Sequence, residues 1–399
     1  MGQLGERLSQ YWLRIQGTLF PFLEEELDPL TETQQQLIAI LELVRIEELV
    51  PNYFRCEGRP QKSRSALARA FIAKTVYNLD TTTALIERLK TDKNLRRICG
   101  WEMPGELPSE STFSRAFAEF AKSGLPQIAH EVLISKTLGN EIILHISRDS
   151  TAIEAREKVE AKPKETKEDI ISTEKAKNPS ASPKKGSKHK KRGRPKKGET
   201  ASIPEPTRIE RQRAMTLGEM LEDLPQRCDK GAKQDSKGNA MYWVGYKLHL
   251  DIADCGIPIS AIVTSASLHD SQVAIPLATL TAERVSSCYD LMDSAYYVPG
   301  IIDHSKELGH VPLIDVNPRR NQELKAALEA ENKAKKTLNW APAEDVRYNV
   351  RTTAERANAR LKDEFGACQL RVRGKIKVTC HLMFGVLVLA ADQLLKLVQ

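Results

Sequence analysis

The pattern of apolar and polar residues divides the chain into two parts. Up to about residue 125 the apolar positions recur every three or four residues, as they do in helices that pack on one face. A capping-box pair, Thr31 and Gln34, opens one of these runs and predicts a helix that continues to Val50. Residues 1–135 are therefore expected to form an all-helical domain.

A later helix of this region, expected from Glu110 to Lys122, has one apolar and one polar face. Its apolar stripe consists of Phe113, Phe117 and Phe120, and its polar face carries Ser111, Ser114 and Arg115. Shorter helices are expected before it, at Thr82–Leu89 and Asp92–Ile98. Two interpretations stay open: a helix-turn-helix domain that places its last helix in a DNA major groove, and a plain helical bundle with a polar outer surface.

From Glu141 onward the chain changes to short runs rich in β-branched residues, which predict strands. Strands are expected from Glu141 to an end at Asp149, and at 241–253, 257–264, 287–292 and 311–316; helices are expected at 207–224, 271–283, 298–308, 348–364 and 378–396. From the first strand on, the core order is β-β-β-α-β-α-β-α, which predicts a ribonuclease H-like α/β fold with a mixed sheet. This domain would comprise residues 136–157 and 207–399.

The segment between these two pieces, residues 158–206, is expected to be disordered, because it is rich in Lys, Glu, Pro, Ser and Gly and has no aromatic residue. Residues 181–200 hold nine Lys or Arg against one Glu, whereas the rest of the chain, with 51 basic and 52 acidic residues, is close to neutral. Within the basic stretch, Lys191, Arg192, Arg194 and Lys196 surround a Gly and a Pro in a pattern that resembles an AT-hook. Such an arm inserts arginines into the minor groove of A·T-rich DNA. The alternative is a generic basic linker.

Composition places the chain among globular proteins. Its seven cysteines are scattered, without the paired spacing of a zinc site, and the absence of a secretory leader favours a reducing cytoplasm. The longest apolar run, Phe384 to Ala391, is too short to cross a membrane and predicts a buried C-terminal helix. No membrane partner is expected.

Three acids are candidates for catalysis. In the predicted fold the first strand lies beside the strand that ends at Asp293, so Asp149 and Asp293 should meet at one edge of the sheet. Glu355, on a late helix, would complete the set. Three carboxylates suit two Mg²⁺ or Mn²⁺ ions, with which nucleases and polymerases carry out in-line displacement at phosphorus.

Glu355 also belongs to a second pattern. If residues 348–364 form one regular helix, Tyr348, Arg351, Glu355 and Lys362 leave it within an arc of about 60°. A carboxylate is then surrounded by three donors that can hold phosphate. The alternative is an ordinary solvated helix with charges at i, i+4 spacings.

With these residues the chain resembles the DDE transposases of bacterial insertion sequences, whose Tyr-x2-Arg-x3-Glu-x6-Lys signature matches Tyr348 to Lys362. Residues 80–122, 245–249 and 267–271 also resemble parts of these proteins. The resemblance implies that Asp149, Asp293 and Glu355 are catalytic metal ligands. It implies that Tyr348 and Arg351 contact phosphates near the scissile bond, and that Lys362 holds the backbone of the transposon end.

By the same resemblance, the enzyme would bind terminal inverted repeats in double-stranded DNA, expose 3′-hydroxyl ends and join them to target DNA, as a dimer in a synaptic complex. Two alternatives stay open: a nuclease of the same fold that cuts without joining, and a transposase-derived DNA-binding protein without catalysis. His269 and Asp270 either approach the metals or form a structural turn. The connection from Arg319 to Ala343 is expected to be helical, where many relatives carry a β-strand insertion.

Overall fold

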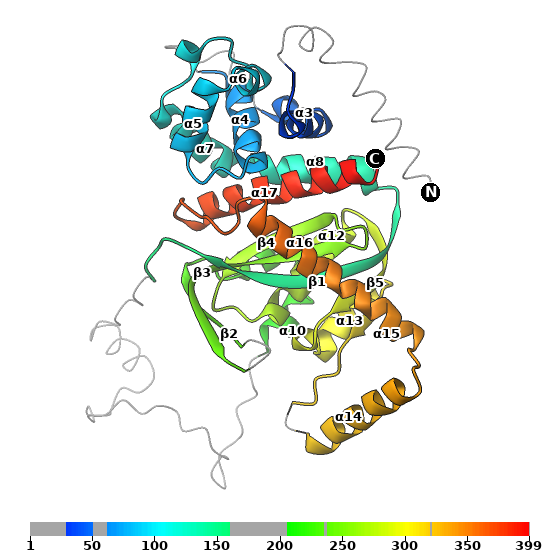
Figure 1. Ribbon diagram of the computed structural model, residues 1–399. Coiled ribbons are helices and arrows are strands. Elements are labelled where there is room, and N and C mark those ends of the chain that lie inside the picture. The colour runs from blue at the N-terminus through cyan, green and yellow to red at the C-terminus, as the bar shows by residue number, and fades with distance from the viewer. Residues whose placement is uncertain (1–28, 51–61, 160–205, 235–237, 320, 399) are drawn as a thin grey trace, which may run out of the picture.

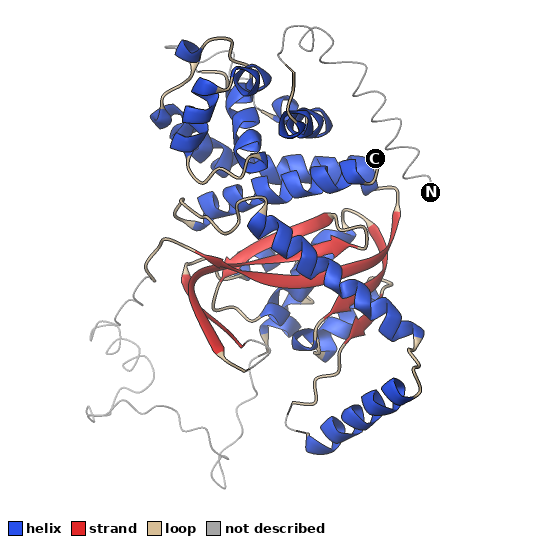
Figure 2. Cartoon of the chain, viewed as in Figure 1, coloured by secondary structure: helices blue, strands red, loops and turns tan. Residues whose placement is uncertain are grey.

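The computed structural model describes residues 29–50, 62–159, 206–234, 238–319 and 321–398. A helical N-terminal region lies above a six-stranded mixed sheet that has helices on both faces (Figures 1 and 2). The N-terminal helices and 3₁₀ turns are α3 (Glu32–Val44), η1 (Ile46–Leu49), α4 (Arg64–Val76), α5 (Thr82–Thr91), α6 (Lys93–Cys99), η2 (Pro104–Glu106), α7 (Glu110–Ser123) and α8 (Leu125–Leu138).

The strands are β1 (Ile142–Glu154), β2 (Asp229–Gln234), β3 (Ala240–Ala253), β4 (Pro258–Ser265), β5 (Ser286–Met292) and β6 (Val311–Ile314). They follow the order β2-β3-β1-β5-β6, with β4 also paired to β3. The pairs β1–β5 and β5–β6 are parallel, and β1–β3, β2–β3 and β3–β4 are antiparallel. This is the mixed sheet of the ribonuclease H-like fold, so the predicted fold class is confirmed.

The remaining helices and turns are α10 (Arg208–Gln212), α11 (Leu217–Asp223), η3 (Asp270–Val273), α12 (Ala274–Ala282), η4 (Ser294–Tyr296), α13 (Pro299–Glu307), α14 (Gln322–Thr337), α15 (Ala343–Tyr348), η5 (Asn349–Arg351), α16 (Thr352–Asp363) and α17 (Lys375–Lys396). In Figure 1, α16 crosses the near face of the sheet, while α12 and α13 lie behind it. The helix α16 contacts β1 and β3, and α12 contacts β3 and β4.

Helix α17 joins the two parts of the molecule. It packs against α3, α4, α7 and α8 on one side and against β4 and α16 on the other. Among the described residues it is the one helix long and apolar enough to cross a membrane, but 83% of its most apolar window is buried within the protein. The predicted buried C-terminal helix is therefore confirmed.

Several predicted elements have different bounds in the structure. The first helix keeps its Thr31–Gln34 capping box but ends at Val44, because Arg45 has a left-handed φ of 46°. The single helix predicted at 207–224 is two helices, since Thr216 leaves the helical conformation and caps α11. Strand β2 was not predicted: its residues, Asp229 to Gln234, lack the β-branched character of a buried strand.

The largest correction concerns β1, which does not end at Asp149. It pairs with β5 only from Ile142 to Ser147, but its pairing with β3 continues to Glu154. Strand β3 is 14 residues long, and because β1 pairs with it, β1 extends beyond the end of its pairing with β5. Asp149 therefore lies within a strand, on the part of β1 that has left β5.

A buried ion pair fixes the register of β1 and β3. Arg148 and Asp251 are opposite each other in the ladder, and the guanidinium donates two hydrogen bonds to the carboxylate, at 2.8 and 2.7 Å. Thr281 of α12 donates a third hydrogen bond to Asp251, at 2.7 Å. Burial by itself lowers the pKa of Arg148, but the charges of Asp251 and Asp290 outweigh it and raise the pKa, so the guanidinium stays charged.

Replacing Arg148 by Met should lower the free energy of unfolding by about 3–5 kcal/mol, because Asp251 then stays buried without a counterion. The double variant Arg148→Met/Asp251→Leu removes both charges and should recover most of the loss. Urea unfolding measures both values. As a control, Lys325→Met breaks the exposed pair with Glu329 and should change stability by less than about 1 kcal/mol. Equal losses in the single and double variants would contradict the assigned role of the pair.

Candidate active site

Two carboxylates meet where β1 and β5 separate. Ser147 and Leu291 form the last parallel pair of the two strands. Asp149 follows two residues later on β1, and Asp293 follows directly after the end of β5. Because successive side chains of a strand point to opposite faces, Asp149 faces away from the side on which Arg148 is buried against Asp251 and α12.

Asp293 is held by the turn that it begins. Its carboxylate accepts a hydrogen bond from the N–H of Ala295 at 2.9 Å and so caps η4. Tyr296, at the end of this turn, is fully buried, and its hydroxyl has no hydrogen-bond partner in the described part of the chain. Burial first, and then the charges of Asp270, Asp149 and Asp293, raise the pKa of Tyr296 well above its usual value. The phenol therefore remains a neutral donor beside the acids.

Without a bound ligand, the protein destabilises the charged forms of Asp149 and Asp293. Burial, and secondarily the charge of Asp293, raises the pKa of Asp149, although a hydrogen bond from the N–H of Ser150 opposes the shift. Burial also raises the pKa of Asp293, to which the charge of Asp270 adds. Neither acid forms an ion pair with a described residue. A bound cation would stabilise the charged forms of both acids.

Asn358 of α16 contacts the first of these acids, and sequence analysis missed it. Its amide donates to Oδ2 of Asp149 at 3.0 Å, and the side chain is 6% exposed. Its own carbonyl oxygen has no partner among the described residues. The only sequence signal is its position three residues after Glu355, which places it on nearly the same face of the helix.

Glu355 has a different environment from the two aspartates. Its carboxylate forms an ion pair with Arg351 at 2.8 Å, and its side chain is 53% exposed. Within the described ranges, no group of three or more His, Cys, Asp or Glu is arranged to hold a metal ion. The structure thus brings Asp149 and Asp293 together and leaves Glu355 on the adjacent helix, turned toward Arg351.

The regular helix expected at 348–364 is interrupted. Tyr348 ends α15, residues 349–351 form the 3₁₀ turn η5, and α16 begins at Thr352. The hydroxyl of Ser147 donates to the carbonyl of Val350 at 3.4 Å and ties this turn to β1. A 3₁₀ turn has about three residues per turn, so it shifts Tyr348 relative to the arc predicted for a regular helix. Arg351 still contacts both the ring of Tyr348 and the carboxylate of Glu355. It also lies close enough to influence the pKa of both Asp149 and Asp293.

The other residues predicted to contact DNA lie near α16, on α7 and outside the described residues. Tyr348 donates its hydroxyl hydrogen to Asp315 at 2.8 Å, and the guanidinium of Arg351 lies 5.7 Å from its ring centroid. Lys362 is half-buried near the other end of α16. Ser111, Ser114 and Arg115 are exposed on α7, opposite its buried Phe residues. Lys191, Arg192, Arg194 and Lys196 lie outside the described residues.

The segment around His269 and Asp270 is a structural turn. His269 caps η3, and its Nδ1 lies 2.8 Å from the hydroxyl of Ser271. Asp270 forms an ion pair with Lys247 at 2.8 Å. We call Asp149 and Asp293 the acid cluster. The negative charge of Asp270 raises the pKa of Asp293 in this cluster.

The residues present fit a divalent cation. Asp149 and Asp293 supply hard oxygen donors and form no ion pair with a described residue, and burial, the largest cause, raises the pKa of both. A bound cation would favour their charged forms. Glu355 forms an i, i+4 pair with Arg351 at the surface, and pairs of this kind contribute about 0.3–0.5 kcal/mol. Replacing this contact by a bound metal ion would therefore cost little.

Two family models match the chain. Residues 146–390 match the model described as "Transposase DDE domain", and residues 23–119 match the model described as "Transposase domain (DUF772)". The first match covers more than half of the chain and contains all three candidate acids. No curated protein and no solved structure matches the chain.

The variants Asp149→Asn and Asp293→Asn should be more stable than the wild type at pH 7 in the presence of a chelator. Each acid has a pKa above its usual value, so the folded state binds protons more tightly than the unfolded state. The charged carboxylate lowers the free energy of unfolding by its full amount above the raised pKa, and this loss vanishes as the pH falls below the usual value of 3.8. Urea unfolding at several pH values measures the free energy of unfolding of each variant and of the wild type. A stability gain that persists unchanged at low pH would contradict this explanation.

The variant Asn358→Ala should weaken divalent-cation binding about 10–100-fold, as loss of a group that orients a ligand typically does. The amide holds Asp149 at 3.0 Å, and without it the carboxylate can rotate. A titration with Mn²⁺, followed by thermal unfolding, gives the midpoint. Asn332→Ala, an exposed change within α14, is the matched control. An unchanged midpoint in Asn358→Ala would contradict a positioning role.

Proposed function

The chain belongs to the DDE transposases, and we propose that Asp149, Asp293 and Glu355 together hold the metal ions with which it cuts and joins DNA. The observation that carries this proposal is the pair of half-buried aspartates at the divergence of β1 and β5, neither of which forms an ion pair with a described residue, with α16 crossing beside them. The family implies dependence on a divalent metal. We assign two ions, Mg²⁺ or Mn²⁺, to this site.

When bound, the two ions would activate the attacking water or 3′-hydroxyl and stabilise the leaving 3′ oxygen. The protein supplies the placement. The sheet holds Asp149 and Asp293 on two neighbouring parallel strands. Asn358 fixes the orientation of Asp149, and Ser147 anchors the turn that precedes α16. The serines near the acids, Ser147, Ser150 and Ser294, have no nucleophilic role in this scheme.

Arg351 acts as an internal counterion in the metal-free protein. It bonds to Glu355 at 2.8 Å, and its charge lowers the pKa of both aspartates. Once Glu355 turns to the metal ions, Arg351 is free to bind a phosphate oxygen near the scissile bond. A guanidinium suits this task because it can donate two parallel hydrogen bonds to phosphate. Tyr348, whose ring contacts Arg351, would limit where that guanidinium can go.

The DNA-binding surface would extend from this site in two directions. Lys362 lies farther along α16 and would hold the backbone of the transposon end. Ser111, Ser114 and Arg115 form an exposed polar face on α7 that would read the terminal repeats. We assign the basic segment with Lys191, Arg192, Arg194 and Lys196 to non-specific minor-groove binding. Synapsis of two ends requires a dimer on DNA.

Each of the variants Asp149→Asn, Asp293→Asn and Glu355→Gln should reduce cleavage by more than about 100-fold, because each removes a charged metal ligand. Binding to duplexes that carry the inverted repeats flanking the coding region should change little. Cleavage of a labelled end and gel-shift affinity measure the two effects. Glu364→Gln, an exposed change one residue after α16, is the control.

The same assay distinguishes transposase chemistry from its alternatives. A transposase with Mg²⁺ joins the labelled ends to a supercoiled plasmid, whereas a nuclease of the same fold releases fragments and joins none. Binding without cleavage in the wild type would indicate a catalytically silent DNA-binding protein. Full activity in any of the three acid variants would overturn the assignment of that residue.

A further inference from the structure

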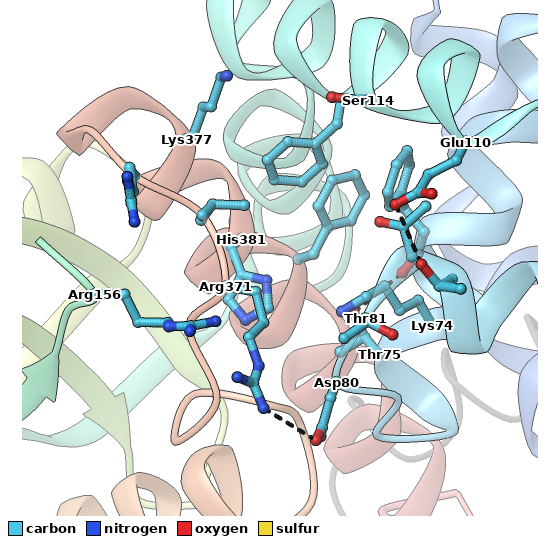
Figure 3. A pocket seen from close by; sticks show the side chains of 17 residues that line it. Lys74, Thr75, Asp80, Thr81, Glu110, Ser114, Arg156, Arg371, Lys377 and His381 are labelled. Atoms are coloured by element: carbon cyan, nitrogen blue, oxygen red, sulfur yellow. Dashed lines mark hydrogen bonds and ion pairs between the residues drawn. The ribbon is translucent and has the colours of Figure 1, made fainter.

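A cavity lies between the N-terminal helices and the beginning of α17. Its volume is about 540 Å³, and its walls come from α4, α5 and α7 on one side and from the end of β1 and residues 371–384 on the other. Figure 3 shows Lys74, Asp80 and Thr81 facing Arg371 and His381 across it. We call this cavity the junction pocket. It is separate from the acid cluster and shares no residue with it.

The junction pocket is strongly basic. Its lining contains five cationic side chains and two acidic ones; the cations are Lys74, Arg156, Arg371, Arg373 and Lys377, and the acids are Asp80 and Glu110. Both acids are already engaged. Asp80 lies 3.8 Å from Arg371, and Glu110 accepts a hydrogen bond from Thr83 at 3.2 Å. Over the described ranges, Arg156, Arg373 and Lys377 have no acidic partner.

The start of α17 adds a partial positive charge at one wall of the pocket. The helix begins at Lys375 without a side-chain cap from its own N-cap residue, and its first turn holds no acid, although the N-terminus of a helix normally favours negative charge. The carboxylate of Glu157 accepts a hydrogen bond from the N–H of Gly374 at 2.8 Å, but Glu157 is not part of the lining. Burial lowers the pKa of Lys74 to about 8, which reduces the positive charge of the pocket in the protein alone. A bound anion would favour the charged form of Lys74.

We infer that the junction pocket binds a backbone phosphate of the transposon-end DNA, at a second contact remote from the cut. This inference rests on the proposed function for the identity of the DNA. The floor of the pocket favours a phosphate over a base, since Phe71, Phe117 and Phe384 are buried and pack on one another rather than offering a free face for stacking. Arginine and lysine side chains with uncapped N–H groups are the usual phosphate donors.

The position of the pocket predicts which phosphate it binds. Arg156 follows Asp149 by seven residues, of which the first five, 150–154, belong to β1 and the last two follow it, so the two residues lie on the order of 20 Å apart at about 3.3 Å per residue. Helix α16 also runs from the two aspartates toward the pocket. The carbonyl of Asp363 at its end accepts a hydrogen bond from Asn78, which is close in sequence to the pocket residue Asp80. At about 3.4 Å per base pair, the phosphate lies about six base pairs from the cut.

The experiment measures binding in a chelator, so that it does not depend on catalysis. Duplexes carrying the inverted repeat are made with one neutral methylphosphonate at each successive linkage. For the wild type, neutral linkages about six base pairs from the cut should weaken binding about fivefold to tenfold. The variant Arg373→Ala/Lys377→Ala should bind unmodified DNA about tenfold more weakly, with a salt slope lower by about one to two, and should be insensitive to those linkages.

Matched controls exclude a general loss of charge or of folding. Arg373 and Lys377 are exposed, so thermal unfolding of the double variant should match the wild type. Lys136→Ala/Lys306→Ala removes two exposed lysines from α8 and α13, away from the pocket, and should retain sensitivity to the same linkages.

Three results would overturn the inference. The first is an unchanged salt slope and linkage sensitivity in Arg373→Ala/Lys377→Ala. The second is sensitivity to neutral linkages only at the cut. The third is displacement of DNA by micromolar ATP or inorganic phosphate, which would indicate a small-molecule site. Loss of cleavage in the wild type, with this binding pattern intact, would instead contradict the proposed catalysis and leave the junction pocket in place.

Discussion

The buried ion pair between Arg148 and Asp251 is the constraint on which the active site depends. The pair joins opposite residues of β1 and β3 and is itself bonded to α12, so it can form in one register only. A shift by one residue would turn every side chain of β1 to the other face. Asp149 would then point toward α12 and away from Asn358 and α16. Apolar residues could stabilise such a strand pair equally well, but they would tolerate more than one register.

Charge is unbalanced in two places, and the imbalances have opposite signs. At the divergence of β1 and β5, burial and mutual repulsion make Asp149 and Asp293 poor anions. In the junction pocket, five cations face two acids that are already engaged. Each arrangement lowers the stability of the protein alone. A ligand that brings divalent cations to the first place and phosphates to the second relieves both, and DNA with its metal ions is such a ligand.

The sequence was sufficient for the parts of the fold that local patterns determine. The capping box at Thr31, the Phe stripe of α7 and the five predicted strands are found, although β2 is an additional strand. It could not indicate how far β1 extends, because that length is set by pairing with β3 and not by β1 itself. The interruption at η5 lies at a tertiary contact that the sequence does not indicate, the bond from Ser147 to Val350. The sequence does not mark Asn358 as a site residue, because its bond to Asp149 becomes apparent only when α16 is placed over β1.

Arg351 connects the signature residues of the late helix with the two aspartates. It ends η5, directly before α16. Its charge lowers the pKa of both aspartates while it bonds to Glu355. The guanidinium thus neutralises part of the acid cluster in the absence of metal. In the proposed site, the bond to Glu355 is exposed and weak, so a bound metal ion would replace the guanidinium among the carboxylates and would leave Arg351 beside the phosphate of the DNA.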